Sequence, residues 1–323
     1  MIIIKLLDIN VASKLFLFFL YLYLCVLEND IKLNIQQQYL NTKVCICTLG
    51  KNENKYILEF VEHYKKYGID KIFLYDNNDI DGERFEDVIG KYVENNFTEI
   101  IDWRGVKGNS TYFGIMDSCY QSHHNEFDWL IFYELDEFLY LKKYSNIKIF
   151  LANKQFDKCE SIQLNWVHMS DNNQLFYENK PLNQRFKQKG KNVIKNKYNK
   201  FCYVKSIIRG HLRNIRITHN HFLSEKIKAC DGFGKKSQLK GLASLNPDYE
   251  FNYIKHYYSK SVQEFIEKIN RGDLLKGNSQ KVINYAIEKF FYINAITLEK
   301  INNIQKHLGK NYNLTKFIRK LKK

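Results

Sequence analysis

The chain has 323 residues, of which 45% are hydrophobic and 15% aromatic, and its formal net charge at pH 7 is +15. This composition indicates a globular protein with a sizeable core, and the presence of only two prolines excludes a Pro-rich linker between domains. The basic residues are dispersed, which fits a general attraction to polyanions, phosphorylated ligands or anionic membranes better than a surface that reads nucleic acid.

The first 40 residues contain an apolar run from Leu15 to Leu27, preceded by two lysines and followed by two acidic residues. That order of charges favours a membrane anchor whose amino end lies in the cytoplasm. The run is shorter than the roughly 20 apolar residues of a spanning helix, so an uncleaved signal or a helix packed on the domain are alternatives. We expect residues 1–40 to associate the protein with a membrane, and a cytoplasmic protein is the alternative.

Predicted strands and helices then alternate along the first half of the chain. The strands are expected over residues 43–49, 71–76, 98–102 and 129–133, and the helices over residues 53–67, 85–92 and 112–121. This alternation predicts an α/β fold whose mostly parallel sheet is covered by helices on both faces. In such sheets, ligands bind beyond the carboxyl ends of the strands.

The pattern is looser beyond residue 153. Strands are expected over residues 160–167, 201–208 and 215–218, and helices over residues 261–271 and 280–305. We predict one domain over residues 41–275, with a looser C-terminal half, and a helical extension with a basic tail over residues 276–323.

Seven cysteines are present, and none forms a CxxC pair. Cys45 and Cys47 alternate on a predicted strand, so they are expected to face one side of it as small core residues. Buried free thiols are the expected state.

The most informative stretch is Asp128 to Leu139, an apolar run that ends in Glu134, Asp136 and Glu137. Glu134 and Asp136 lie two apart on an extended chain and point to one side. Crowded carboxylates repel one another and resist desolvation, so they need a cation, a positive side chain or water. Hard divalent cations prefer such oxygen clusters, and a solvated strand end is the alternative.

Asp76 and Asp102 also occupy predicted carboxyl ends of strands. Because parallel strands end at the same edge of a sheet, we expect these side chains to converge with the acidic cluster. This coincidence favours a functional site over separate local features.

Several blocks of the sequence together resemble a known family. They are Lys51-Asn52-Glu53, Glu59, His63, Gly68, Tyr75-Asp76-Asn77, Glu134-Leu135-Asp136-Glu137-Phe138, Arg185-Phe186, Lys205-Ser206-Ile207, His219 and His221, and His256-Tyr257 with Lys260-Ser261. In order and spacing they resemble glycosyltransferase family 92 and a related family 2 branch long called a domain of unknown function. The resemblance covers about residues 43–272.

The chain departs from the family pattern at a few positions. Glu134 stands where the acidic motif usually begins with Asp, and Asp79 stands where Ser is common. Gln184 replaces a usual Glu, and residues 165–169 lack a glycine-bearing stretch. The first two changes keep polar function available, whereas the last two affect the expected acceptor site more than the donor site.

The resemblance implies a GT-A fold, a nucleotide-sugar donor and Mn2+ (or Mg2+) as cofactor. We assign Asp136 as the principal metal ligand, assisted by Glu134. His219 or His221 is expected to complete the metal site from the later half, since histidine is a common metal ligand. A core or acceptor-binding histidine is the alternative for either one.

Five residues are expected to contact the donor. Asn52 and Glu53 lie at the first strand-to-helix junction, where backbone donors favour anions, and helix capping is their alternative role. Asp76 is expected to contact the base or ribose, with Asn77 beside it either assisting or only shaping the turn. Lys205 is a candidate for the diphosphate, because an ammonium stabilises the leaving charge.

An inverting transfer needs a carboxylate that deprotonates the acceptor hydroxyl, and we choose Asp171 over Asp231 for this role. The sequence therefore predicts a metal-dependent glycosyltransferase that moves a hexose from a nucleotide sugar to a glycan or glycoconjugate acceptor. The alternative is a catalytically inactive GT-A-like basic module that binds polyanions or an anionic membrane surface.

Overall fold

The computed structural model describes residues 41–106, 110–190, 203–218, 227–272 and 279–308, together with residues 13, 16, 18–24 and 26. Within these residues the main sheet contains β1 Val44–Gly50, β2 Lys71–Asp76, β3 Thr98–Asp102, β4 Trp129–Phe132, β5 Glu137–Leu141, β6 Ser161–His168, β7 Val204–Arg209, β8 Ala229–Asp231 and β11 Asn252–His256. A two-stranded sheet pairs β9 Leu239–Lys240 with β10 Ala243–Ser244.

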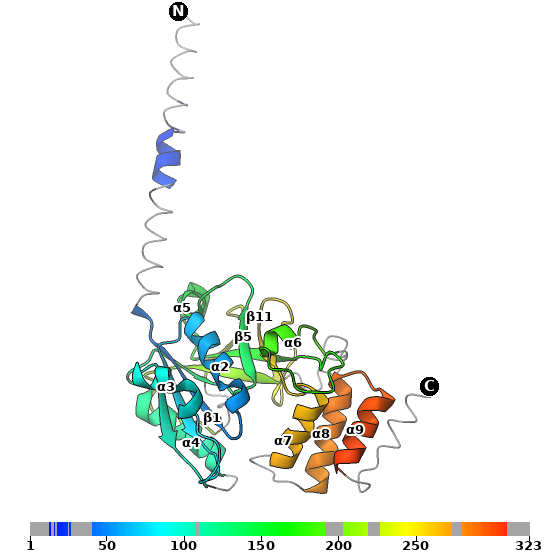
Figure 1. Ribbon diagram of the computed structural model, residues 1–323. Coiled ribbons are helices and arrows are strands. Elements are labelled where there is room, and N and C mark those ends of the chain that lie inside the picture. The colour runs from blue at the N-terminus through cyan, green and yellow to red at the C-terminus, as the bar shows by residue number, and fades with distance from the viewer. Residues whose placement is uncertain are drawn as a thin grey trace, which may run out of the picture.

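The helices flank this main sheet (Figure 1). They are α2 Asn54–Lys66, α3 Glu86–Glu94, α4 Ser110–His123, α5 Ile147–Leu151, α6 Leu182–Arg185, α7 Val262–Arg271, α8 Gln280–Ile293 and α9 Leu298–Leu308, with a 3-10 turn at Lys154–Phe156.

The strand order of the main sheet is β3-β2-β1-β4-β7-β6-β11-β5, and β8 pairs with β6. The first four strands are parallel, as the alternation of strands and helices predicted. The strand β7 runs antiparallel to β4 and β6, and β11 runs parallel to β6 but antiparallel to β5. The predicted α/β fold class with a mostly parallel sheet is confirmed.

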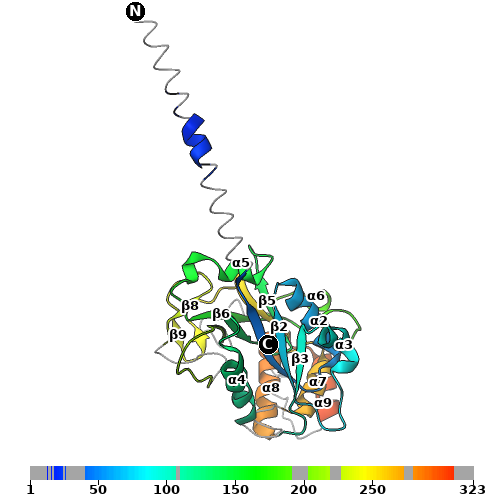
Figure 2. The same ribbon diagram turned by 90° about the vertical axis from the view of Figure 1, so that its left-hand side faces the viewer.

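Alternation along β1 sends its side chains to two different cores. Val44 and Ile46 pack with the buried stripe of α2, whereas Cys45 and Cys47 pack on the opposite face with side chains of α4. Figure 2 shows α2 and α3 on one side of the parallel strands and α4 on the other. The prediction that helices cover both faces is therefore confirmed.

The prediction of buried free thiols is right for Cys45 and wrong for Cys47, Cys119, Cys159 and Cys230. Cys45 is a buried free thiol, but Cys47 forms a disulfide with Cys119 that joins β1 to α4. A second disulfide joins Cys159 to Cys230 and links the approach to β6 with β8. The partners lie 72 and 71 residues apart, so the pairing depends on tertiary contacts that no local pattern reports.

Two predicted elements differ from the structure. Residues 215–218 form no strand, because the Ile217 amide and the Arg216 side chain bind Asp117 of α4 instead of a strand partner. The predicted helix over residues 280–305 is broken into α8 and α9. The break follows Asn294, whose side chain accepts from the Asp171 amide and donates to Ser259 rather than continuing a helical surface.

The helices α7, α8 and α9 lie side by side and share one apolar core (Figure 1). Phe265 of α7 stacks on Phe290 of α8 with ring centres 4.3 Å apart. The buried pair of Lys300 in α9 and Asp171, 2.6 Å apart, joins this bundle to the loop after β6. The helical part of residues 276–323 is thus packed against α7, which belongs to the predicted domain 41–275.

The expectation that residues 1–40 anchor the protein in a membrane is wrong. In the described part of the chain, no helix combines the length and the apolar character that crossing a bilayer requires. The physical reason is already present in the sequence, where the apolar run from Leu15 to Leu27 is shorter than a spanning helix.

Candidate active site

The acidic motif forms a tight turn between β4 and β5. The Glu137 amide donates to the Glu134 carbonyl at 2.9 Å, and the Glu134 amide donates to the Glu137 carboxylate at 3.0 Å. The Asp136 carbonyl accepts from the Tyr257 amide at 2.9 Å, which attaches the turn to the residue after β11. These contacts hold the carboxylates at the carboxyl end of β4, where the sequence placed them.

Glu134, Asp136 and His256 form a cluster with metal-ligand chemistry. One ligand atom from each lies within 4.8 Å of the others, and His256 Nε2 is 3.4 Å from Asp136 Oδ1. His256 is 2% exposed, yet neither ring nitrogen has a hydrogen-bond partner. Buried polar atoms are ordinarily satisfied, and a divalent cation bound by two carboxylates and an imidazole would satisfy these.

The pKa of His256 supports this assignment. Burial lowers the pKa of His256 to about 4, against the opposing effect of the Asp136 carboxylate. The ring is therefore neutral near pH 7, and neutral imidazole is the form that binds metal ions. The residues fit Mn2+ or Mg2+ as the resemblance implied, and the choice between these ions stays a prediction.

Two lysines balance the carboxylates. Lys205 is completely buried and lies 2.8 Å from Glu134 and 3.2 Å from Glu137. Lys268 of α7 lies 2.8 Å from Asp136 Oδ2. Each carboxylate of the turn is therefore in contact with an ammonium group.

The pKa values of the three carboxyl groups differ. Burial acts to raise all three, but the Lys205 ammonium lowers the pKa of Glu134 to about 2, and Lys268 with His256 holds the pKa of Asp136 well below its usual range. At Glu137 burial prevails and raises the pKa to about 8. Glu134 and Asp136 are thus the two ionised groups that a cation would contact.

His219 and His221, the expected third ligands, lie outside the described residues, so their role stays a prediction. Sequence reasoning placed His256 in a family block but gave it no metal role. The structure brings it to the site because β11 pairs with both β5 and β6, setting His256 opposite Glu137 and His168. The sequence showed no sign of His256 as a ligand, because its position depends on the pairing of β11 with strands far away in the chain.

Asp76 and Asn77 lie at the carboxyl end of β2 and both organise the loop that follows. Asp76 is buried, with Oδ2 2.7 Å from Arg104 Nη2, and Oδ1 accepts from the Asn78 side chain at 2.7 Å. The Asn77 side chain donates to the carbonyls of Trp103 at 3.2 Å and of residue 106 at 3.0 Å. Asp102 lies opposite Asp76 in the β2–β3 register, but neither residue belongs to the cluster of Glu134, Asp136 and His256, so their convergence with the acidic motif stays a prediction.

Glu53 and Asn52 lie at the junction of β1 and α2. The Glu53 side chain makes no capping bond to α2 and instead lies 2.6 Å from Arg271 and 3.6 Å from Lys260. Asn52 has a φ of 53° and donates its amide to Asn78 Oδ1 at 2.7 Å. Glu53 thus draws two cationic side chains to this edge of the sheet.

Asp171 lies completely buried on the loop after β6. Its carboxylate contacts Lys300 of α9 at 2.6 Å and accepts from the Asn173 amide at 2.9 Å. Burial raises its pKa, and Lys300 acts in the opposite direction. The structure thus places this predicted base in an ion pair with the C-terminal helices.

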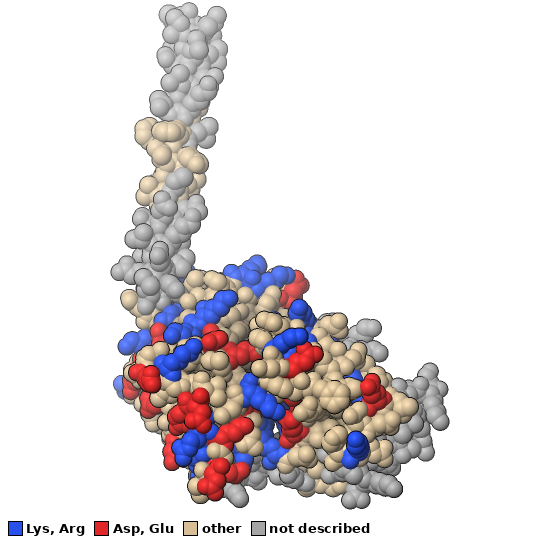
Figure 3. All heavy atoms as spheres, viewed as in Figure 1, with Lys and Arg blue, Asp and Glu red and all other residues tan. Residues whose placement is uncertain are grey.

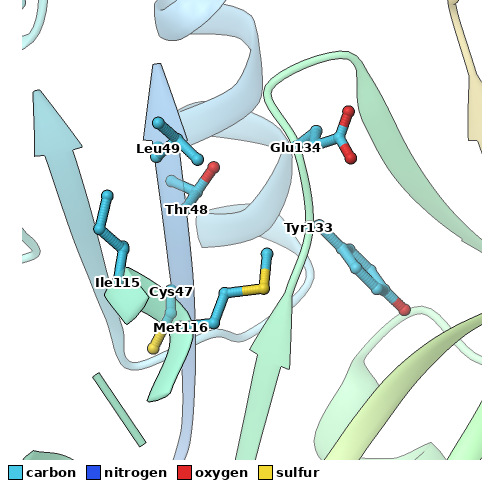
Figure 4. A pocket seen from close by; sticks show the side chains of 7 residues that line it. All are labelled: Cys47, Thr48, Leu49, Ile115, Met116, Tyr133 and Glu134. Carbon is cyan, nitrogen blue, oxygen red and sulfur yellow. The ribbon is translucent and has the colours of Figure 1, made fainter. Parts of the chain in front are cut away.

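A small pocket opens at the carboxyl ends of β1 and β4, next to the acidic turn. It is lined by Cys47, Thr48, Leu49, Ile115, Met116, Tyr133 and Glu134. Figure 4 shows Tyr133 and Glu134 on the loop after β4, across from Thr48 and Leu49 of β1. This is the edge of the parallel strands where α/β proteins bind ligands.

Positive and negative side chains are interspersed on the face of the molecule that Figure 3 shows. A single-signed basic surface is the usual mark of polyanion binding, so this face does not favour the alternative of a polyanion-binding module. The charges that gather at the acidic turn are mostly buried and paired.

The protein has an α/β fold. An acidic turn and a buried histidine lie at the edge of its sheet where ligands bind in proteins of this class. The model of glycosyltransferase family 92 matches residues 41–307, and the chain belongs to this family. The recognition made from the sequence blocks is confirmed, and the match continues beyond residue 272 through α8 and most of α9.

Two curated relatives show the same kinship. A glycosyltransferase family 92 protein of Ricinus communis is 27% identical over 103 residues, covering 32% of this chain and 17% of the relative. One of Oryza sativa subsp. japonica is 26% identical over 112 residues, covering 34% of this chain and 18% of the relative. The matched part thus spans less than a fifth of the length of these relatives.

Among solved structures, S. aureus TarS 1-349 in complex with UDP-GlcNAc is similar at a TM-score of 0.35 with 13% identity, covering 83% of this chain and 80% of that one. A longer S. aureus TarS structure also gives a TM-score of 0.35 with 12% identity, covering 86% of this chain and 49% of that one.

Proposed function

We propose that the protein is a metal-dependent glycosyltransferase that moves a hexose from a nucleotide sugar to a glycan or glycoconjugate acceptor. The observation that carries the proposal is the cluster of Glu134, Asp136 and His256, whose ligand atoms lie within 4.8 Å of one another at the ligand-binding edge of the sheet. Membership of glycosyltransferase family 92 supports the reaction class.

In this proposal Asp136, Glu134 and His256 hold the divalent cation. When bound, the cation supplies a Lewis acid that neutralises charge developing on the leaving diphosphate. Lys205 fixes Glu134 through its 2.8 Å contact, so that this carboxylate stays in place and ionised. Lys268 adds a further positive charge at the same edge, favourable for an anionic leaving group.

The donor is proposed to lie along the carboxyl ends of β1 and β2. Asn52, Glu53, Asp76 and Asn77 all lie there, and their contacts shape the two loops that would border the nucleotide. Lys205 acts on the diphosphate, in this proposal, only through the carboxylates it holds, because its ammonium is completely buried.

Asp171 is our candidate for the base that accepts the proton of the acceptor hydroxyl. A carboxylate can act so only within hydrogen-bond reach of the hydroxyl. Since Asp171 contacts Lys300 at 2.6 Å, the proposal requires this ion pair to open when the acceptor binds.

The experiment that tests the proposal is a thermal-shift screen against UDP-, GDP- and CMP-sugars, each with and without Mn2+. A ligand that binds only the native state raises the unfolding temperature. We expect one nucleotide class to stabilise the protein, and only when Mn2+ is present. The Asp136→Ala variant should keep its fold and lose that response. A full response in the variant, or no response to any sugar nucleotide in the wild type, would contradict the proposal.

A further inference from the structure

Helix α7 is anchored beside the acidic turn by a buried network at its first turn. Ser261 and Glu264 form a capping box, in which the Glu264 carboxylate accepts from the Ser261 amide at 3.0 Å. The same carboxylate accepts from Arg185 at 3.0 Å and from the Tyr56 hydroxyl at 2.6 Å. Lys268 lies four residues after Glu264, on the same face of α7, so the anchored helix directs the Lys268 side chain towards the acidic motif.

Lys268 shares Asp136 with the proposed metal site. Its ammonium lies 2.8 Å from Asp136 Oδ2, while Oδ1 of the same carboxylate faces His256 Nε2 at 3.4 Å and has no hydrogen-bond partner. A divalent cation bound to Asp136 would lie close to this ammonium, and two positive charges at that separation repel strongly. The cation and Lys268 therefore compete for the carboxylate.

Lys268 and Lys205 differ in how easily each ammonium group can be released from its carboxylate partner. The Lys268 side chain is 28% exposed, whereas the Lys205 side chain is 0% exposed and contacts two carboxylates. Release of a lysine whose side chain is partly exposed costs less than release of one that is completely buried. Lys268 also lies 4.6 Å from the centre of the Tyr258 ring, which offers a cation a second contact.

We propose that Lys268 is an exchangeable counter-ion of Asp136. It neutralises the carboxylate before the metal ion binds, leaves Oδ2 when the ion arrives, and then directs its charge to an anionic group of the ligand, such as a diphosphate. The inference rests on the proposed function, because it requires a divalent cation at Glu134, Asp136 and His256. Lys205, in contrast, is the permanent partner of the turn.

The test is a titration of the protein with Mn2+ alone. The electron paramagnetic resonance signal of the unbound ion measures how much Mn2+ stays free at each step. The Lys268→Met variant lacks the competing ammonium and is expected to bind Mn2+ about tenfold more tightly than the wild type. A tenfold change corresponds to the free energy of about one hydrogen bond to a charged group. Lys268→Arg keeps the charge and should bind like the wild type. Arg271→Gln is the matched control, since Arg271 lies on the same helix but contacts Glu53.

Tightening in Lys268→Met that clearly exceeds the tightening in Arg271→Gln supports the exchange. Equal affinity of the wild type and Lys268→Met, or equal tightening in both variants, overturns the inference but leaves the proposed function standing. Absence of Mn2+ binding by the wild type overturns both.

A second measurement needs no variant. Acetic anhydride labelling of the wild-type protein, read by mass spectrometry, should modify Lys268 more when saturating Mn2+ is added, while Lys205 stays unmodified. Labelling of Lys268 that is unchanged or reduced by bound Mn2+ would overturn the exchange.

Discussion

Lys205 has no exposed surface, and its ammonium contacts Glu134 at 2.8 Å and Glu137 at 3.2 Å. Burial of an ammonium is costly unless it is paired, and removal of one partner leaves the other charges uncompensated. Lys55 and Glu267 form an ion pair at 2.8 Å in which both side chains are more than a third exposed. Water can therefore solvate either charge when its partner is removed.

We therefore expect Lys205→Met to lower the free energy of unfolding by about 3–5 kcal/mol. Lys55→Met, the matched control, should change it by no more than about 1 kcal/mol. Urea unfolding followed by circular dichroism measures both. Equal and small effects would show that the buried lysine does not hold the acidic turn together.

His63 gives a prediction about pH. Burial lowers its pKa from 6.5 to about 4, and its Nε2 atom lies 3.1 Å from the Leu139 carbonyl. Below pH 6.5 the unfolded chain binds a proton at this ring that the folded protein does not bind until pH 4. The stability contributed by the neutral ring is thus complete above pH 6.5 and is lost as the pH falls through this window.

At pH 5 the loss from His63 amounts to about 2 kcal/mol. His63→Gln should therefore lose less unfolding free energy than the wild type between pH 7 and pH 5. His307→Gln, at an exposed histidine, is the control and should follow the wild type. Parallel curves for His63→Gln and the wild type would refute this role of burial.

At the scale of elements, the Cys47–Cys119 disulfide joins β1 to α4 across a separation of 72 residues. Cys47 also lines the pocket beside the acidic turn, as do Ile115 and Met116 of α4. The disulfide thus fixes a helix that borders the candidate site. Since disulfides persist in oxidising conditions, refolding of the chain should require an oxidant.

Replacement of Cys47 and Cys119 by Ala together should lower the free energy of unfolding by about 2–4 kcal/mol, because the unfolded chain gains conformational freedom. Replacement of Cys159 and Cys230 is the comparison, since their separation of 71 residues predicts a similar loss. Denaturant unfolding under oxidising conditions measures both. Unchanged stability in the first double variant would contradict a bond between β1 and α4.

Element prediction succeeded where the signals are local. The parallel strands β1 to β4 and the helix α2 were predicted, because apolar periodicity is visible in short windows of the sequence. The strands β5 and β11 were missed. Their pairing joins residues more than 100 positions apart, such as Asn252 and Leu141, and β5 was hidden by the apolar run that ends β4.

The same limit applies to the candidate site. Glu134 and Asp136 could be proposed from one short motif, but His256 and Lys268 reach them only through β11 and α7. A short motif is enough to predict that clustered carboxylates need a cation. The sequence alone does not predict which distant side chains contact those carboxylates.

At the scale of the whole molecule, the C-terminal helices are attached to the sheet through buried polar contacts as well as apolar packing. Lys300 of α9 contacts Asp171 at 2.6 Å and donates to the Asn173 side-chain oxygen at 3.0 Å. Asn294 ties the end of α8 to the same loop. The bundle of α7, α8 and α9 therefore supports the helix that carries Lys268.

Lys300→Met should lower the free energy of unfolding by about 3–5 kcal/mol, because it leaves the Asp171 carboxylate buried without its cation. Adding Asp171→Asn removes that charge and should recover a large part of the loss. Thermal and urea unfolding of the single and double variants form the test. If the double variant is no more stable than Lys300→Met, the two side chains do not act as a pair.

The central claim is that Glu134, Asp136 and His256 bind one divalent cation. A direct measurement is Mn2+ titration of the wild type, Asp136→Asn and His256→Gln by electron paramagnetic resonance. We predict one Mn2+ site in the wild type and an affinity at least about 100-fold weaker in each variant, since loss of an outer partner alone costs 10–100-fold. Wild-type affinity in both variants, or no Mn2+ site in the wild type, would contradict the account.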